Sequence, residues 1–271
     1  MKLGAVFPQT EIGNDLVGIR DFAQAVEDLD YDYLSAYECV TGDWQVPHTY
    51  QHTPLTLLSH LVGLTHRLKL LTSSLVIPSQ QTVLVARQAA GLDVLSGGRL
   101  RLGVAAGWDS PECQAMGANK CIEEQIALLR ALWTRPLVTF KGEHHAISEF
   151  GLDPLPVQRP IPIWVSGTAD ADLRRAARLG DGWFAPTLPI PQAKELVTRL
   201  HGYLEQAGRE PGDLRIRCRV GMAMSSVWPE YVGLWRDMGA THVELGTMGA
   251  GLETPQEHVA ALRRFRLKVG G

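Results

Sequence analysis

A glutamate and a cysteine, Glu38 and Cys39, follow a short stretch with strand character, YDYLSAY at residues 31–37. A carboxylate at a strand end can act as a general acid or base, or can bond a ligand. A thiol beside it could join the same chemistry, although a lone cysteine also serves as a small core residue. Glu38 and Cys39 are therefore candidate catalytic residues, with a surface glutamate and a buried cysteine as the plainer interpretations.

Three adjacent hydroxyl residues, Thr72, Ser73 and Ser74, interrupt the otherwise apolar stretch LKLLTSSLVI at residues 68–77. A buried strand that only packs against its neighbours does not require hydroxyl side chains. Hydroxyl groups at a strand end can bond a polar ligand, and they can also satisfy backbone groups where strand pairing is interrupted. Both interpretations make this stretch a place to look for a site.

Small residues form the end of a further stretch, GVAAGW at residues 103–108. Ala106 and Gly107 would let a flat ring approach the backbone closely, or would let a neighbouring helix pack against it. Trp108 would wall such a pocket or cover the core. These three residues are candidates for contact with a planar ligand.

A strand, a turn of small residues and a helix follow one another in WVSGTADADL, residues 164–173. The turn, with Ser166, Gly167, Thr168 and Ala169, and the first helical N–H groups form a potential anion site. Asp170 and Asp172 suit the helix dipole but would repel a phosphate nearby. The arginines that follow could offset that charge.

Other chemistry is less well supported. Glu244 lies inside the apolar stretch THVELGTM, and paired with Glu38 it would give the two carboxylates of a barrel hydrolase. The adjacent His144 and His145 would point to opposite faces of a strand, with no third ligand nearby. No metal site is therefore expected.

The elements that must position these residues alternate along the chain. Short apolar stretches predict strands and longer amphipathic stretches predict helices, in eight strand–helix pairs. This alternation indicates a parallel sheet, and eight units in 271 residues predict an α/β fold of the (β/α)8 TIM-barrel type. An open doubly wound sheet is the alternative, but the first turn lacks its glycine pattern. The rhythm breaks after Trp108, so we expect an insertion after strand 4 of a single domain spanning residues 1–271.

Composition narrows the class of protein. The chain is 45% hydrophobic and 20% charged, with a formal net charge of -3, and its basic residues are scattered. This balance does not favour nucleic acid as a partner. No apolar run has the length of a membrane span, and the first residues lack a signal-peptide pattern. We expect a cytoplasmic protein with no membrane partner.

Several of these motifs together resemble the luciferase-like monooxygenase superfamily, in particular its branch that uses the deazaflavin coenzyme F420. The resemblance rests on residues 73–117, from SSLVIPSQQ to CQAMG, on PLPVQRPIPIWVSGTADADLRRAARLGDGWF, and on LDYDYLSAYECV. It extends from Lys2 to about Phe184, and more loosely to the end of the chain. The motifs occur in order at the expected intervals.

The resemblance implies a cofactor across the strand tops, F420 first and FMN as the alternative. In relatives the third strand carries a non-proline cis peptide that makes a bulge against the ring, and the matching bond is Ser73–Ser74. Gly107 and its neighbours would contact the cofactor, the Gly167–Ala169 turn would hold its phosphate, and Glu38 would lie near the ring. Cys39 departs from the pattern, because well-studied sugar-phosphate dehydrogenases of the family have a catalytic histidine there.

The function implied is an oxidoreductase that transfers a hydride between a deazaflavin or FMN and a small organic substrate. The first alternative is an FMN-dependent monooxygenase that uses reduced flavin and O2, supplied by a partner reductase. A barrel hydrolase using Glu38 and Glu244, and an inactive flavin-binding protein, are alternatives of other classes. Dimers are common among the relatives, so a homodimer is expected.

Overall fold

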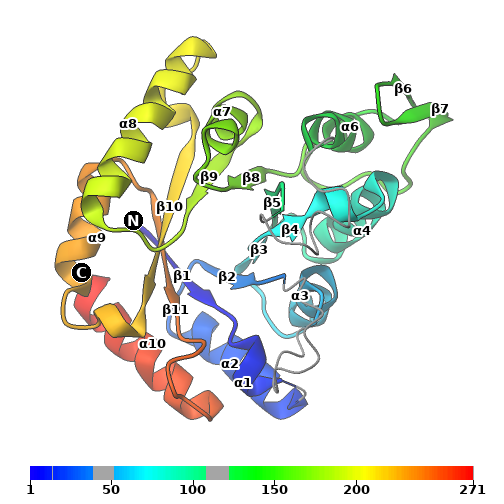
Figure 1. The fold of residues 1–271 in the computed structure, drawn as a ribbon. Coiled ribbons are helices and arrows are strands. Elements are labelled where there is room, and N and C mark those ends of the chain that lie inside the picture. Colours follow the sequence, from blue (N-terminus) through cyan, green and yellow to red (C-terminus); the bar gives the residue numbers. More distant parts are fainter. Residues whose placement is uncertain (14, 39–51, 108–121, 271) are drawn as a thin grey trace, which may run out of the picture.

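Parallel strands and helices alternate and close into a barrel (Figure 1) in the computed structural model, which describes residues 1–13, 15–38, 52–107 and 122–270. The barrel strands are β1 (Lys2–Val6), β2 (Tyr33–Ala36), β3 (Lys69–Thr72), β4 (Leu75–Val76), β5 (Leu100–Ala105), β8 (Ile163–Ser166), β9 (Gly182–Ala185), β10 (Arg215–Gly221) and β11 (His242–Gly246). β3 and β4 together form one interrupted barrel strand, the third stave. The barrel therefore has eight strands, and the predicted (β/α)8 fold is confirmed.

The pairing is parallel throughout the barrel and runs in the order β3-β2-β1-β11-β10-β9-β8-β5-β4. The barrel closes where β3 pairs with the start of β5, and β4 pairs with the end of β5. Between β3 and β4 the Ser73–Ser74 peptide bond is cis, as the family resemblance implied. The third stave is therefore interrupted at the hydroxyl residues that stood out in the sequence.

Helices surround the barrel because each carries an apolar stripe that packs on the strands. α2 (Leu16–Asp28) buries Ile19, Phe22 and Val26, at helical spacing, and Asp15 caps its first turn. The other long helices are α3 (Pro54–Val62), α4 (Thr82–Leu95), α7 (Asp170–Leu179), α8 (Ile190–Gln206), α9 (Trp228–Asp237) and α10 (Pro255–Val269). Short helical turns are α1 (Gln9–Ile12), η1 (Ile77–Ser79), η2 (Pro211–Asp213) and η3 (Met222–Met224).

The described part of the insertion after the fourth barrel strand contains α6 (Ile122–Thr134) and a hairpin that was not predicted from the sequence. The hairpin pairs β6 (Val138–Lys141) with β7 (Ala146–Phe150) and projects from the barrel (Figure 1). The expectation that His144 and His145 lie on a strand was wrong, since they lie in the turn. His145 bonds Glu124 at 2.7 Å and the Thr82 hydroxyl at 2.7 Å.

The barrel interior near the strand starts contains two rings that two glycines accommodate. A Cβ atom on Gly4 would lie 2.1 Å from the Tyr33 ring, and one on Gly182 would lie 2.3 Å from the Trp164 ring. Tyr33, Leu71 and Trp164 form an apolar cluster separate from the main core between strands and helices. The main core holds the barrel together, while this smaller cluster fills its centre.

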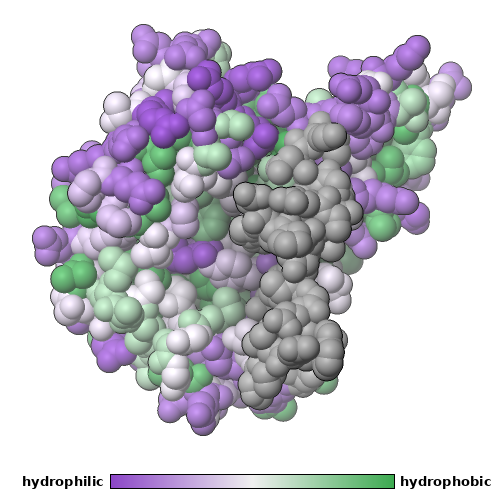
Figure 2. Space-filling view, viewed as in Figure 1, coloured by the Kyte–Doolittle hydropathy of each residue, from purple (hydrophilic) through white to green (hydrophobic). Residues whose placement is uncertain are grey.

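The surface in the orientation of Figure 1 is mixed in character. Figure 2 shows hydrophilic residues gathered over α7 and α8, and a hollow near the middle of the barrel. Within the described ranges, no helix is long and apolar enough to cross a membrane.

Candidate functional site

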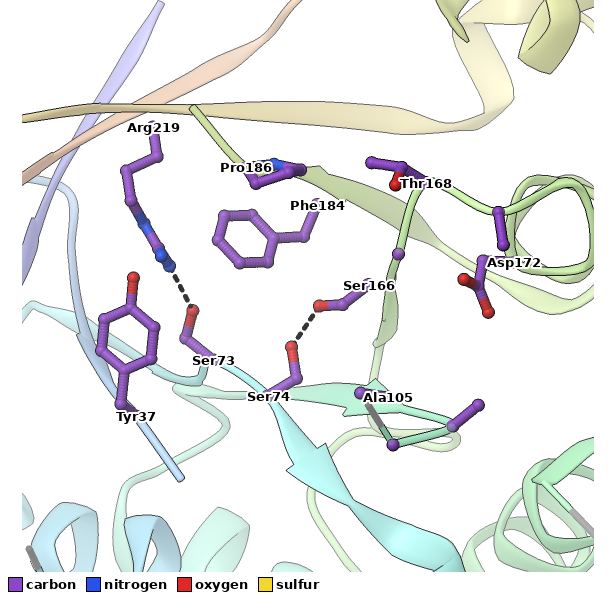
Figure 3. Close-up of a pocket in the computed structure, with 14 residues that line it drawn as sticks. Tyr37, Ser73, Ser74, Ala105, Ser166, Thr168, Asp172, Phe184, Pro186 and Arg219 are labelled. Atoms are coloured by element: carbon purple, nitrogen blue, oxygen red, sulfur yellow. Dashed lines mark hydrogen bonds between the residues drawn. The ribbon is translucent and has the colours of Figure 1, made fainter. Parts of the chain in front are cut away.

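A cavity of about 410 Å³ lies at the carboxyl ends of the strands (Figure 3), where barrel enzymes place their active sites. Its walls come from residues after β2, β5, β8 and β9 and from the interrupted third stave. Eight of the nine predicted cofactor contacts line it: Ser73, Ser74, Ala106, Gly107, Ser166, Gly167, Thr168 and Ala169. Trp108 and Cys39 lie outside the described residues. The structure thus brings the predicted residues together, while their binding roles remain a prediction.

The three hydroxyls of the third stave have three different partners. The Thr72 hydroxyl donates to the Gly103 carbonyl and accepts from the Gly103 N–H, both at 2.8 Å, which repairs the strand pairing where it is interrupted. The Ser74 hydroxyl bonds that of Ser166 on β8 (Figure 3). The Ser73 hydroxyl accepts hydrogen bonds from two arginines of β10. Thr72 thus has a structural role, and Ser73 and Ser74 face the cavity.

A buried ionic network lies directly beneath Ser73. Arg217 and Arg219 share Glu244, with N–O distances of 2.9 Å and 2.8 Å, and both donate to the Ser73 hydroxyl at 3.0 Å and 3.1 Å. The Ser35 hydroxyl donates to the same carboxylate at 3.0 Å. Two guanidinium groups facing one carboxylate leave a positive charge below the cavity.

Glu244 does not serve as the second carboxylate of a hydrolase. Its side chain is fully buried, and each oxygen is in an ion pair with an arginine. An acid or base must exchange a proton with a substrate, and this carboxylate is already committed to two cations. The hydrolase alternative is therefore wrong in its assignment of Glu244.

Arg219 carries the positive charge of the network into the cavity wall. Its guanidinium carbon lies 4.2 Å from the Tyr37 ring centroid and 4.4 Å from that of Phe184, within cation–π range. Burial lowers the pKa of Arg219, and Glu244 opposes that effect. An anionic or electron-rich group in the cavity would therefore meet a cation already desolvated and oriented.

Glu38 lies at the end of β2, and it is a structural neighbour of the third stave. Its carboxylate accepts from the Val76 N–H at 2.5 Å and from the Gln80 side chain at 2.9 Å. Burial raises its pKa, while these two hydrogen bonds oppose the shift. Glu38 is not among the residues that line the described cavity, so its catalytic role remains a prediction.

At the turn before α7, nearby arginines offset the negative charges of the two aspartates that would repel a phosphate. Asp170 is drawn towards α8 by Arg199 and Tyr203 and is also paired with Arg174. Asp172 lines the cavity, but the largely buried Arg175 neutralises it at 2.7 Å. At the start of α7 the Asp172 N–H already donates to the Ala169 carbonyl at 3.0 Å, which leaves the N–H groups of the preceding residues for a ligand. The turn therefore fits a phosphate group better than its sequence suggested.

Gly167 is required by the geometry of that turn. Its φ is +124°, and a Cβ atom there would lie 2.1 Å from the Asp172 carboxylate. Gly107, which follows the neighbouring strand β5, has a φ of 109°. Both conformations favour glycine.

The cavity wall also includes Tyr37, Phe184, Pro186 and Arg219, which were not predicted from the sequence. A signal existed for the arginine. Arg215, Arg217 and Arg219 alternate along one predicted strand, and alternate residues share a face. Three arginines on one face of a barrel strand predict charges inside the barrel. Tyr37 and Phe184 showed no such pattern.

The arrangement fits a planar, redox-active ring with a phosphate-bearing tail. Small residues at the ends of β5 and β8 would leave room for the ring. Two aromatic side chains, Tyr37 and Phe184, and the Arg219 guanidinium would line the same space, and the turn before α7 would offer N–H groups. Among the described residues, no group of three or more histidine, cysteine, aspartate or glutamate side chains is placed to hold a metal ion.

Comparisons with known proteins agree with this geometry. An uncharacterized protein of Mycobacterium tuberculosis is 29% identical, over 97% of this chain and 98% of its own. The FMNH(2)-dependent dimethylsulfone monooxygenase of Pseudomonas putida is 29% identical over 61% of this chain and 47% of its own. The coenzyme F420-dependent tetrahydromethanopterin reductase of Methanopyrus kandleri has the same fold, with a TM-score of 0.80 at 12% identity, over 99% of this chain and 98% of that one.

The two named enzymes depend on FMNH(2) and on coenzyme F420, respectively. Residues 2–265 match the family described as luciferase-like monooxygenase. This chain belongs to the luciferase-like monooxygenase family.

Proposed function

We propose that this protein binds coenzyme F420 in the cavity at the strand ends and transfers a hydride between the deazaflavin ring and a small organic substrate. The observation that carries the proposal is the convergence of Ser73 and Ser74, Gly107 and the 166–169 turn on one cavity. The sequence alone predicts the same residues as cofactor contacts. The cofactor supplies the redox chemistry, and the chain supplies position and charge.

Each wall has a distinct task in this proposal. Ser73 and Ser74 form the floor under the ring, and Ala106 and Gly107 allow its close approach. The N–H groups of the turn at Gly167–Ala169 hold the phosphate. Arg219 stabilises negative charge on the ring or substrate, since Glu244 and Ser73 already hold its guanidinium in place.

A second candidate is an FMN-dependent monooxygenase that receives reduced flavin from a separate reductase. It is favoured by the relative in Pseudomonas putida, an FMNH(2)-dependent dimethylsulfone monooxygenase. The same walls would then hold FMN. In both cases the substrate is a small molecule, and we expect a cytoplasmic homodimer.

Binding titrations separate these candidates. The purified protein would be titrated with F420, FMN and riboflavin, following quenching of the ligand's fluorescence. We expect F420 to bind and riboflavin, which lacks the phosphate, to bind at least about tenfold more weakly than FMN. Tighter binding of FMN than of F420 would favour the monooxygenase. If none of the three ligands binds, the proposed function is overturned.

Turnover then tests activity. The complex with the tighter ligand would be mixed with a panel of small alcohols, aldehydes and enones, and the ring absorbance followed without O2. Hydride transfer to or from one of these compounds would support the reductase. Formation of an oxygenated product only with reduced FMN and O2 would support the monooxygenase, and neither outcome with a bound ring would favour an inactive flavin-binding protein.

A further inference from the structure

A second cavity, of about 330 Å³, opens at the other end of the barrel, where the strands begin. Its walls include the first residues of β1 and β3 and the inward side chains of β2, β8 and β11. The network of Arg217, Arg219 and Glu244 lies between this cavity and the one at the strand tops. Nothing in the proposed function uses the second cavity.

The inner wall of this cavity is aromatic. The Trp164 and His242 rings lie 5.0 Å apart in an edge arrangement, and the Tyr33 and His242 rings lie 5.6 Å apart. Leu71 completes an apolar surface with Tyr33 and Trp164. A flat apolar group could contact His242 and the accessible edges of Tyr33, Leu71 and Trp164, which are 3–5% exposed.

The rim carries more positive than negative charge. Two of its cations are neutralised, since Lys2 pairs with Asp32 at 2.7 Å and Arg67 with Asp30 at 3.4 Å. The two remaining cations, Lys69 and Arg101, are in no ion pair within the described ranges. The rim therefore has an excess of two positive charges over its carboxylates.

Lys69 is the rim cation available to a ligand. Its ammonium group makes no hydrogen bond to any described residue, whereas Arg101 bonds Gln158 at 2.5 Å and the Leu100 carbonyl at 2.8 Å. Burial and then the nearby Arg101 and Arg99 lower the pKa of Lys69, so an anion beside it would relieve an existing repulsion.

Two polar groups in the inner wall are also unused. The Tyr33 hydroxyl is buried and has no hydrogen-bond partner among the described residues. His242 bonds the Thr241 hydroxyl through Nδ1, which leaves Nε2 without a described partner. A buried hydroxyl that is left unpaired costs free energy, which a polar substituent on a ligand would recover.

We propose that this cavity is a second binding site, for a small aromatic carboxylate. The ring would lie against Trp164, His242 and Leu71, and the carboxylate would accept hydrogen bonds from the Lys69 ammonium at the rim. A simple inorganic anion would leave the aromatic wall unused, and a neutral aromatic compound would leave Lys69 unpaired.

Calorimetric titration of the full chain with benzoate, benzamide and acetate tests this assignment. We expect benzoate to bind, with benzamide and acetate each at least about tenfold weaker, because each lacks one of the two recognised features. Acetate as tight as benzoate would overturn the proposal in favour of general attraction of anions. No binding of benzoate in the millimolar range would also overturn it.

Variants locate the site. Lys69→Gln should weaken the binding of benzoate by about tenfold or more and leave the affinity for benzamide unchanged. Lys141→Gln, at an exposed position on β6, should change neither affinity. Saturation with F420 or FMN should leave benzoate affinity unchanged. Competition with these cofactors would assign benzoate to the upper cavity and overturn the second site, and failure of the cofactors to bind would leave the benzoate result intact.

Discussion

At the scale of single residues, the centre of the barrel depends on one carboxylate. Glu244 holds two arginines that otherwise would be buried without a counter-charge, and through them it holds Ser73 under the cavity. Buried ion pairs contribute little relative to apolar packing, but removing one partner is costly. The network therefore specifies position more than it adds stability.

Replacing Glu244 tests this view. Glu244→Gln keeps the shape and loses the charge, so two guanidinium groups stay buried without an anion. We expect a loss of about 3–5 kcal/mol in the free energy of unfolding, measured by urea denaturation. Glu195→Gln is the control, because the Glu195 side chain is 70% exposed and its ion pair with Arg199 is long, at 3.8 Å. A surface pair contributes about 0–1 kcal/mol, and equal losses in the two variants would contradict the role given to Glu244.

Arg219 belongs to the same network but faces the cavity. In reduced FMN the ring carries a negative charge that the oxidised ring lacks. Arg219→Gln should therefore weaken the binding of reduced FMN by about tenfold more than the binding of oxidised FMN. Arg219→Lys should restore part of the difference because it keeps the charge. Anaerobic titrations with both forms measure the effect. Equal weakening of both forms would show that Arg219 shapes the cavity without sensing charge.

At the scale of elements, the interrupted third stave and the turn before α7 build the cavity from opposite sides. Thr72 reconnects β3 to β5 across the interruption, and Ser74 links the stave to β8 through Ser166. The turn at Gly167–Ala169 continues from β8 into α7. The third stave and β8 are therefore linked through β5, which pairs with both β4 and β8, and through the Ser74–Ser166 contact.

Gly167→Ala probes the turn. The added Cβ atom would collide with Asp172 in a backbone conformation that favours glycine, so the turn must shift. We expect FMN affinity to fall by about tenfold or more, with a smaller effect on riboflavin, in fluorescence titrations. Gly202→Ala in α8 is the matched control, because nothing lies within 4 Å of its added Cβ atom. That variant should keep FMN affinity and gain about 1 kcal/mol of stability.

At the scale of the whole molecule, the barrel has a cavity at each end and a charged layer between them. The wall of the lower cavity has two more cations than carboxylates, and the network of Arg217, Arg219 and Glu244 has one more cation than carboxylates, in a chain whose formal net charge is -3. The lower opening would therefore attract anionic ligands from solution.

The aromatic end of the barrel predicts a dependence of stability on pH. Burial, with the positive charges of Arg217 and Arg215, lowers the pKa of His242 to about 3. The unfolded chain binds a proton at this residue near pH 6.5, and the folded chain does not. Stability is therefore fully present above pH 6.5 and is lost as the pH falls from 6.5 towards 3.

Urea denaturation across that range measures the effect. His242→Gln should flatten the curve between pH 6.5 and 3, whereas His60→Gln, at an exposed position on α3, should leave it unchanged. An unchanged slope in the His242 variant would mean that other groups cause the acid sensitivity.

The sequence by itself determined the barrel and most of the cavity wall. Strand and helix periodicities are local, so eight alternating pairs could be read without knowing any contact. Small residues at strand ends and a small-residue turn before a helix also leave local signals, and these identified Gly107 and Gly167. The family resemblance predicted the cis bond at Ser73–Ser74, which the structure contains.

Only the tertiary structure decided how side chains distant in sequence share one space. Glu244 resembled a catalytic carboxylate until the barrel placed two arginines of β10 against it. Tyr37 and Phe184 line one cavity and Lys69 lines the other, because closure of the barrel brings separate strands together. A sequence records which face a residue occupies, but the partners across the barrel depend on strand register and closure, which are properties of the whole sheet.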